Sequence, residues 1–466
     1  MIARIDTTFS AQKRVEDAAR RIRLSDSTGE SAQNVLYQLR EDNGCLTLFL
    51  VNTGFPDPLE ASDLRCTRVV ERTRIYPQLT LEVFTEYEGE WIELDLRNGN
   101  FNRVAAERTA FGWRFPLSLG RLESRMFLLA PAGRFITKRT PQLLQSDYRI
   151  PQASCWKFTR TEPNVLILDH PAWRLNQGEW EKPTYFMQIN RKIREDAGFP
   201  QSVRQPWARK PSGKSAGSLE LRYYFTCEEF PDALFLVLEQ PERYRITCNG
   251  KPLNSDADGW WVDPALQRLP IAKEVLNNGK NELHFTVDYL FDEPGIETVF
   301  LIGEFGVIRE EPDGGILTGL PEITPGDWTL QKLPYYSGSG IYSLHWENAI
   351  APDERVFIRC GEFGGAAVKI MVNDILAGIA FTGDEEIELT PYFDGTGTAT
   401  LTLEVLGTRR NSHGPFYMKR YPMAIGPAEF EQYDHSDRKL VPAGLLELPE
   451  IILRHNRSQG DIGKKI

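Results

Sequence analysis

Residues 244–253 read Tyr244-Arg-Ile-Thr-Cys-Asn-Gly-Lys-Pro-Leu253, in which polar and apolar residues alternate up to an Asn-Gly pair. Alternation with a period of two is typical of a half-buried strand, and Asn-Gly readily adopts the left-handed backbone of a tight hairpin turn. Residues 368–376, Val-Lys-Ile-Met-Val-Asn-Asp-Ile-Leu, repeat the pattern with an Asn-Asp turn. The second half of the chain is therefore predicted to contain the same hairpin twice.

The sequence around the two hairpins also recurs in the same order. Each copy has a polar–aromatic alternation and an apolar strand before the hairpin, and a short amphipathic piece and a last strand after it. The paired stretches are 219–226 and 340–347, 233–239 and 356–362, 269–276 and 387–393, and 279–287 and 397–405. Any two β-domains share some alternation, but blocks that keep both order and spacing indicate two related β-sandwich modules.

The chain has 466 residues, which suits about three domains, and 41% of them are hydrophobic, enough for a core in each. We expect an all-β protein of tandem β-sandwiches, with a short N-terminal helix at 11–23. The predicted domains are 1–140 (the helix and a first sandwich), 141–312 (a jelly roll with a long irregular insertion), 313–425 (a second jelly roll) and 426–466 (an extended C-terminal tail).

Charge and hydropathy restrict the partners and the compartment. The net charge of -11 argues against a nucleic acid or an anionic membrane, since both attract a basic face. No stretch approaches the ~18 apolar residues of a membrane span. Met1-Ile-Ala-Arg4 does not open a secretory signal. The sequence predicts a soluble protein, cytoplasmic if the chain is complete, and otherwise leaves the compartment open.

The order of several short motifs resembles that of a known family. Asn249-Gly250 is followed by Trp261-Val-Asp-Pro, Leu269-Pro-Ile and Gly279-Lys-Asn-Glu-Leu, and Asn411-Ser-His-Gly-Pro stands near the end of the second module. These motifs resemble the galactose-binding-like jelly rolls of large bacterial glycoside hydrolases, of the β-galactosidase/β-glucuronidase group or the α-L-rhamnosidase type.

The first domain fits the same resemblance, which covers roughly residues 30–425. Residues 34–40 and 48–53 are similar to strands of the sandwich that follows the catalytic barrel in such enzymes. This chain has no alternating strand–helix series of the ~250 residues that a barrel needs. The resemblance therefore implies the C-terminal, accessory part of a glycoside hydrolase without the catalytic barrel, or a separate accessory chain.

No residue is assigned a catalytic role. No His has a second His three or four residues away, as many zinc sites require, and there is no Gly-x-Ser-x-Gly elbow. We expect no cofactor. The resemblance allows a structural calcium ion, whose ligands the sequence does not identify.

Saccharide contact remains as a function, because flat aromatic rings and side chains of fixed hydrogen-bond geometry recognise the faces and hydroxyl groups of sugars. The alternative is that these aromatic residues plug the ends of the sandwiches or pack against a neighbouring domain. The candidate carbohydrate-binding residues are Trp260, Trp261, Asp263, Trp328, Tyr335, Tyr336, Asn411 and His413.

Three functional interpretations are open. The first is a non-catalytic region that braces a catalytic glycosidase domain or chain and contacts carbohydrate, which predicts an exposed apolar patch on the first domain. The alternative is a self-contained glycosidase or polysaccharide lyase in a sandwich cleft, which needs a pocket with two or more carboxylates of perturbed pKa. An unrelated cell-surface or adhesion protein is a third reading.

Overall fold

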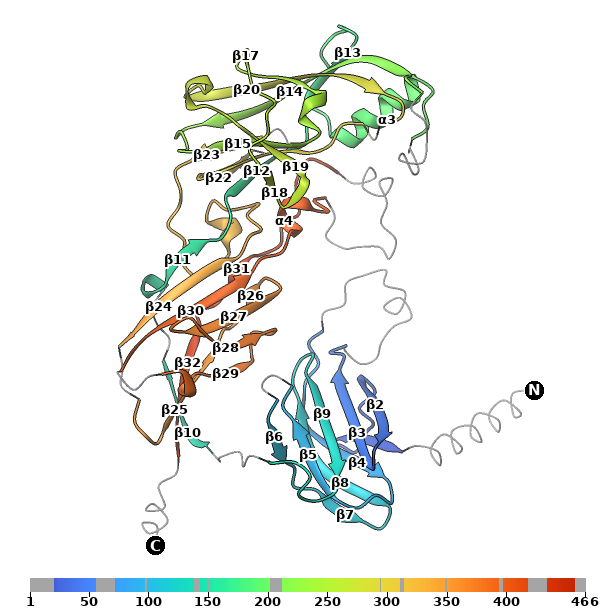
Figure 1. Cartoon of the computed structure of the whole chain (residues 1–466), viewed down its shortest axis with the longest axis vertical. Helices are drawn as coiled ribbons and strands as arrows, with labels where there is room; N and C mark the ends of the chain where they lie inside the picture. The colour runs from blue at the N-terminus through green and yellow to red at the C-terminus, as the bar shows by residue number, and fades with distance from the viewer. Residues whose placement is uncertain are drawn as a thin grey trace, which may run out of the picture. The chain divides into compact units, whose positions relative to one another are not determined.

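The structure of the protein is a computed structural model (Figure 1). It describes residues 21–55, 72–96, 99–137, 143–149, 151, 153–201, 212–293, 295–310, 314–347, 350–393, 397–417 and 434–456. These residues form two compact units with a boundary at Leu143, and each is described by itself. Strands dominate both units, so the all-β prediction is confirmed. The helix predicted at 11–23 lies outside the described residues except for Arg21 to Arg23.

The first unit is a β-sandwich of two antiparallel sheets. One sheet has the order β1(Ile22–Asp26), β4(Tyr76–Phe84), β8(Gly112–Leu119), β7(Glu107–Thr109), and the other β2(Val35–Asp42), β3(Cys45–Asn52), β9(Ser124–Ala130), β5(Glu90–Leu94), β6(Phe101–Arg103). Leu46, Leu48 and Leu50 of β3 are buried in one core with Leu79 and Leu81 of β4. The apolar residues at every second position of each strand therefore point inward and form this core.

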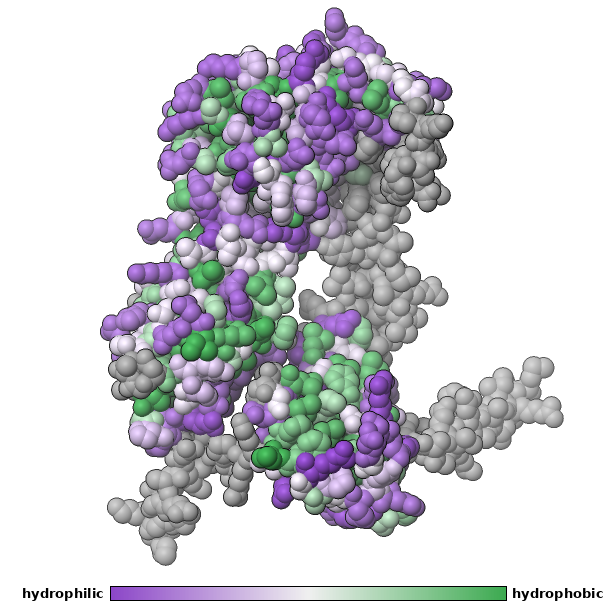
Figure 2. All heavy atoms as spheres, viewed as in Figure 1, coloured by the Kyte–Doolittle hydropathy of each residue, from purple (hydrophilic) through white to green (hydrophobic). Residues whose placement is uncertain are grey.

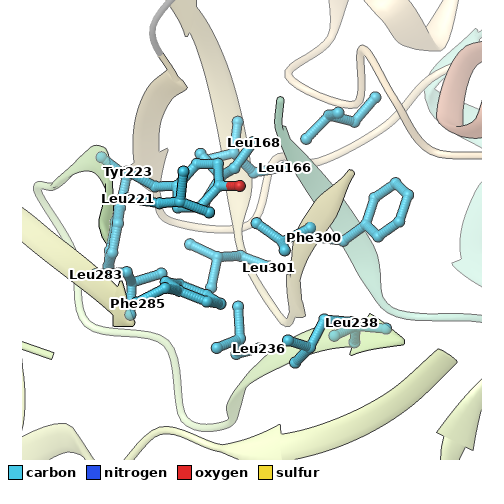
Figure 3. Close-up of a cluster of buried hydrophobic side chains, with 14 of the residues drawn as sticks. Leu166, Leu168, Leu221, Tyr223, Leu236, Leu238, Leu283, Phe285, Phe300 and Leu301 are labelled. Atoms are coloured by element: carbon cyan, nitrogen blue, oxygen red, sulfur yellow. The ribbon is translucent and has the colours of Figure 1, made fainter. Parts of the chain in front are cut away.

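The second unit contains two further sandwiches, and the first of them, module A, spans residues 164–318. One sheet has the order β12(Asn164–Leu168), β21(Val299–Gly303), β15(Leu234–Glu239), β19(Asp263–Pro270), β18(Trp260–Trp261). The other has the order β17(Lys251–Pro252), β16(Arg245–Cys248), β20(Gly279–Leu290), β14(Ser215–Cys227), β23(Gly314–Thr318), β22(Gly306–Glu310), and β13(Ala172–Leu175) also pairs with β14. Figure 3 shows the core between the sheets, where Tyr223 and Phe285 lie near Leu236 and Leu301.

The other sandwich, module B, is formed by described residues within 143–160, 324–417 and 434–456. One sheet has the order β10(Leu143–Arg149), β32(Glu450–Asn456), β25(Glu354–Arg359), β29(Glu386–Glu388). The other has the order β11(Lys157–Arg160), β24(Gly340–Glu347), β30(Thr398–Leu406), β27(Ala367–Val372), β28(Ile375–Ala380), and β26(Phe363–Gly364) pairs with β31(Gly444–Leu445). A separate core fills module B.

The repeat predicted from the sequence extends to the whole topology. The order β13-β14-β20-β16-β17 of module A has its counterpart in β11-β24-β30-β27-β28 of module B, and β12-β21-β15-β19 matches β10-β32-β25-β29. Both hairpin turns are left-handed, with φ of 52° at Asn249 and 48° at Asn373. The Asn249 side chain accepts a hydrogen bond from the Glu282 amide (3.0 Å) and Asn373 accepts one from the Thr400 amide (2.9 Å).

The two modules are nested rather than consecutive, which corrects the predicted domain limits. Module A is inserted between β11 and β24 of module B, so residues 143–160 pair with strands of the last sandwich and not with module A. The predicted C-terminal tail is also corrected, because β32 lies between β10 and β25 inside a sheet. These pairings join segments about 100 to 300 residues apart, which local alternation does not reveal.

The irregular insertion predicted within the first jelly roll contains a regular helix, α3(Phe186–Asp196). Its buried residues Phe186, Ile189 and Ile193 recur at helical spacing and pack into the core of module A. Among the described residues, no helix is both long and apolar enough to cross a lipid bilayer.

Candidate functional site

The β18–β19 hairpin carries three of the candidate carbohydrate-binding residues and separates them. Trp260 pairs with Gln267 and is 55% exposed, whereas the next side chain, Trp261, is buried. Asp263 is exposed, and its carboxylate accepts a hydrogen bond from the Ala265 amide (2.9 Å). Because neighbouring side chains of a strand point to opposite faces, only Trp260 and Asp263 remain open to a ligand.

The tip of this hairpin has an unusual backbone. Val262 stands between Trp261 and Asp263 with φ of 67°, a left-handed conformation that costs energy for a β-branched residue. Such conformations persist where the surroundings hold them, and they cluster at ligand-binding sites. Here the anchor is the buried Trp261 ring, whose centre lies 5.3 Å from that of Phe300. The anchored tip therefore fixes the direction of the exposed Trp260 ring.

Polar residues flank Trp260 along the β18–β19 hairpin. The Arg268 guanidinium donates to the Asp258 carbonyl oxygen (2.8 Å) and lies 4.0 Å from the Asp258 carboxylate. The half-buried Gln267 is the cross-strand partner of Trp260. The next side chain, Arg268, lies on the other face of β19, with its guanidinium 4.9 Å from the centre of the Phe235 ring. The exposed Trp260 ring beside the Gln267 amide offers an apolar face together with a hydrogen-bond donor and acceptor.

Two of the candidate binding residues, Trp261 of module A and His413 of module B, contact each other where the two modules adjoin. The imidazole of His413 in α4(Arg410–His413) lies 5.3 Å from the Trp261 ring and 5.5 Å from the Phe300 ring. Desolvation, with the nearby Arg409 charge, lowers the pKa of His413, which favours the neutral ring. Asn411 is buried, where it bonds the Val441 amide (2.9 Å) and carbonyl (2.8 Å). His413 thus joins the two modules, whereas Asn411 joins two segments of module B.

Trp328, Tyr335 and Tyr336 belong to the cores. The Trp328 indole is fully buried and donates a hydrogen bond to the Tyr342 hydroxyl (2.6 Å). The buried Tyr336 hydroxyl accepts from the Thr161 amide (3.0 Å) and donates to the Ser339 carbonyl (2.7 Å). Tyr335 packs in the core of module A. With Asn411, these rings have no face open to a saccharide, so the structure corrects their interpretation as binding residues.

A buried polar cluster was missed by the sequence analysis. Asp169 follows β12 and forms an ion pair with Arg438, and both side chains are fully buried. The Asp169 carboxylate also contacts His170 Nδ1 (2.8 Å) and accepts from the Tyr417 hydroxyl (3.1 Å). Burial alone would raise the pKa of Asp169, but Arg438, His170 and Tyr417 together bring it below the ordinary value.

The same cluster fastens residues 434–443 of module B to module A. His435 stacks on Tyr185 with ring centres 4.1 Å apart. Asp169 and Arg438 are separated by 269 residues along the chain, so no local pattern signals the pair. Because every charged group in the cluster is enclosed, its chemistry is structural.

A small cavity in module A contains two carboxylates. Glu239 and Glu297 line it beside Arg243 and Tyr244, and its volume is about 20 Å³. Desolvation, with the Glu239 charge, raises the pKa of Glu297 to about 7. A carboxyl group that titrates near neutrality suits general acid–base chemistry. A cavity of this size holds about one water molecule and no sugar ring.

The structure assigns no metal ligands. Within the described ranges, no three His, Cys, Asp or Glu side chains come together as a set that could hold an ion. The structural calcium ion that the resemblance allows therefore stays a prediction without assigned ligands.

Comparisons with known proteins find similar solved structures only. No protein-family model matches the chain, and no curated protein does. A rhamnosidase from Novosphingobium sp. PP1Y is similar over 96% of this chain and 26% of its own, with 11% identity and a TM-score of 0.39. A β-D-mannosidase from Dictyoglomus thermophilum is similar over 54% of this chain and 31% of its own, with 12% identity and a TM-score of 0.21. A glycosyl hydrolase family 2 member from Bacteroides cellulosilyticus DSM 14838 is similar over 54% and 32%, with 12% identity and a TM-score of 0.17. The chain spans about a quarter to a third of the length of these structures.

Proposed function

We propose that this chain is a non-catalytic, carbohydrate-associated region of a glycoside hydrolase. In this proposal the β18–β19 hairpin of module A contacts saccharide, and the first unit packs against a catalytic domain. The observation that carries the saccharide contact is the exposed Trp260 ring on a hairpin whose neighbouring residue, Trp261, is anchored in the interior.

The exposure of Trp260 supports a role in binding. Tryptophan is highly buried on average, because leaving its large apolar surface in water forgoes hydrophobic stabilisation. Here 55% of the residue is in solvent, and the polar side chain of its cross-strand partner Gln267 lies on the same face. The apolar face of a sugar ring can cover the indole while its hydroxyl groups bond to the Gln267 amide.

Replacing Trp260 by alanine should weaken saccharide binding at least about tenfold, which corresponds to about 1.4 kcal/mol of lost stacking and apolar burial. The measurement is a broad glycan array on the full chain, followed by calorimetry of any saccharide that binds. The free energy of unfolding should change by less than about 0.5 kcal/mol, because the side chain is exposed.

The control for this variant is Phe381→Ala, which removes an aromatic ring of module B that is also largely exposed. Saccharide affinity should stay at the wild-type value in Phe381→Ala. The saccharide role of the hairpin is refuted if the wild-type chain binds no glycan on the array, or if Trp260→Ala binds as tightly as wild type.

The packing role of the first unit is supported by one face of its larger sheet. The strand β3 is apolar on both faces: Leu48 and Leu50 point inward, while Phe49 is half-buried on the outer face beside Met126 of β9. Leu36 on the edge strand β2 is 59% exposed. Figure 2 shows hydrophobic residues gathered on this unit around β3 and β9. A strand with two apolar faces is typical of a sheet covered on both sides.

The reading frame upstream of Met1 tests this packing role. We expect it to encode an alternating strand–helix series of about 250 residues. In the longer protein, the amide hydrogens of β2 and β3 should exchange more slowly than in this chain alone, because the catalytic domain covers them. The strands β7 and β8 of the other sheet serve as the internal control. Equal exchange of β2 and β3 in both proteins would contradict packing through this face.

The alternative function, a self-contained glycosidase or lyase, has one observation in its favour. The raised pKa of Glu297 beside Glu239 is the kind of shift that a general acid needs. Two carboxylates that cleave a glycosidic bond must leave space for the sugar between them. The cavity of about 20 Å³ does not provide it, and we therefore rank this function second.

A further inference from the structure

A second open site lies in the second unit, along the strand β11. It is a groove of about 800 Å³, within the range of ~300–1,000 Å³ usual for ligand sites. One wall contains Ser154 and every residue from Trp156 to Pro163, and the opposite wall is the segment Leu320–Thr324. Successive side chains of a strand point to opposite faces, so a groove that touches all of them follows the edge of the strand.

That edge of β11 carries backbone groups that face away from its neighbour. In the described part of the chain, β11 is the outermost strand of its sheet and pairs only with β24. The register places Arg160 opposite Gly340, and the next residue, Thr161, donates its amide to the Ser339 carbonyl (3.1 Å). Bonded and non-bonded pairs alternate in an antiparallel ladder. The N–H and C=O groups of Phe158 and Arg160 therefore point toward the groove.

Two buried side-chain donors on the same wall also have no partner. Trp156 Nε1 and Arg160 Nη1 are enclosed and form no hydrogen bond within the described structure, although another nitrogen of Arg160 pairs with Glu304. Both atoms are closed to solvent, so a ligand in the groove meets the backbone edge of β11 and not these donors. The outward groups of Phe158 and Arg160 lie two residues apart, which along a strand is about 7 Å. A ligand that bonds to both residues must therefore be extended.

The aromatic rings of this wall are not available for stacking on a sugar. Trp156 is 3% exposed, and the Phe158 ring packs 5.0 Å from Tyr342 and 5.7 Å from Trp328 in the core of module B. A polypeptide chain, by contrast, presents carbonyl and amide groups at the same repeat as the free edge of β11. Addition of an extended peptide to an exposed sheet edge is a recurrent mode of recognition.

The opposite wall indicates which side chains such a peptide would carry. Leu320 is 47% exposed and stands next to Pro321, so it offers apolar contact. Among the acidic residues of the groove, Glu304 is neutralised by Arg160 and Glu162 by Arg409 (2.5 and 2.7 Å). Glu322 is exposed on this wall. Charge complementarity therefore favours a basic side chain at this point.

We propose that the edge of β11 is the docking site of an extended polypeptide segment that adds to the sheet of module B as a further strand. The segment places an apolar side chain on Leu320 and a basic side chain near Glu322. This site is separate from the β18–β19 hairpin and does not depend on saccharide binding.

The test uses a random dodecapeptide library displayed on phage and selected against the full chain. Selected peptides, made synthetically, should slow hydrogen exchange at the amides of Phe158 and Arg160. In an added strand, every second residue of the peptide turns its amide toward β11. N-methylation of these residues should abolish binding, whereas N-methylation of the residues between them should leave binding unchanged. Selection of no peptide, or peptides that leave both amides unprotected, would overturn the proposal. So would a glycan that protects the two amides where the peptides do not.

Two pairs of variants locate the contact. Arg160→Pro removes the outward N–H that Arg160→Ala keeps, and neither change touches a ladder bond to β24, so the proline variant should bind at least about tenfold more weakly. Leu320→Asp should weaken binding by a similar factor. Leu330→Asp, at an exposed leucine that does not line the groove, should leave binding at the wild-type value. Strand addition at this edge would be overturned if Arg160→Pro bound the peptides as tightly as Arg160→Ala, and Leu320→Asp as tightly as Leu330→Asp.

Discussion

Replacing Arg438 by methionine should lower the free energy of unfolding of the second unit by about 3–5 kcal/mol, which is the usual cost of removing one partner of a buried ion pair. The side chains of Arg438 and Asp169 are both fully enclosed. Without the guanidinium, the contacts that the Asp169 carboxylate keeps with described side chains are those to His170 and Tyr417. Urea unfolding of the full chain, followed by circular dichroism, measures the loss.

The loss of unfolding free energy in Arg438→Met should change with pH in a defined direction. In the wild type, the pKa of Asp169 is lowered, so the pair's stabilisation is present at neutral pH and is lost only as the pH falls below the ordinary value of 3.8. In Arg438→Met, burial without the cation raises the pKa of Asp169, and protonation then relieves the unpaired charge. The difference from wild type should therefore be smaller at pH 5 than at pH 7.5.

The adjacent Lys439 provides a matched control, because it forms an exposed ion pair with Asp437 (2.7 Å). Lys439→Met should cost less than about 1 kcal/mol, as surface pairs generally do. If Arg438→Met lost no more stability than Lys439→Met, or lost the same amount at both pH values, the Asp169–Arg438 pair would not be the bond that holds residues 434–443 to module A.

Patterns within the sequence predicted the strands but not their long-range partners. The turns at Asn249 and Asn373 could be predicted because the residue that must adopt a left-handed φ stands in the turn itself. The pairing of β32 with β25 joins residues about 100 positions apart, and β10 lies on the other side of β32. Residues 450–456 carry the apolar run Ile451–Leu453, but proline and charge around it favoured the interpretation as a tail.

Because local patterns do not reveal long-range partners, the sequence also could not separate the candidate binding residues that are exposed from those that are buried. Alternation requires that Trp260 and Trp261 point to opposite faces, but which of them faces inward depends on the sheet that packs below. An aromatic residue near a turn serves a core or a surface equally well, as Trp328 and Trp260 respectively illustrate. The groove along β11 combines Ser154 and residues 156–163 with residues 320–324, and these two segments flank the inserted module A in the sequence.

Replacing Trp328 by alanine should destabilise module B by about 3–5 kcal/mol, the range for deletion of a large buried aromatic side chain. The ring is fully buried, with its centre 5.6 Å from that of Tyr336 and 5.7 Å from that of Phe158. The change also leaves the Tyr342 hydroxyl without its 2.6 Å donor. Urea unfolding, followed by tryptophan fluorescence and circular dichroism together, measures the change.

Leu330→Ala is the control from the same short helix, η5(Trp328–Leu330), because Leu330 is 84% exposed and should cost less than about 0.5 kcal/mol. Comparison with Trp260→Ala then separates a core tryptophan from a binding one. Trp328→Ala should lose stability yet bind saccharide as wild type does at temperatures where it stays folded, whereas Trp260→Ala should keep its stability and lose affinity. A Trp328→Ala protein that unfolds at the wild-type urea concentration but no longer binds saccharide would place this indole at a ligand surface, against its burial in the core of module B.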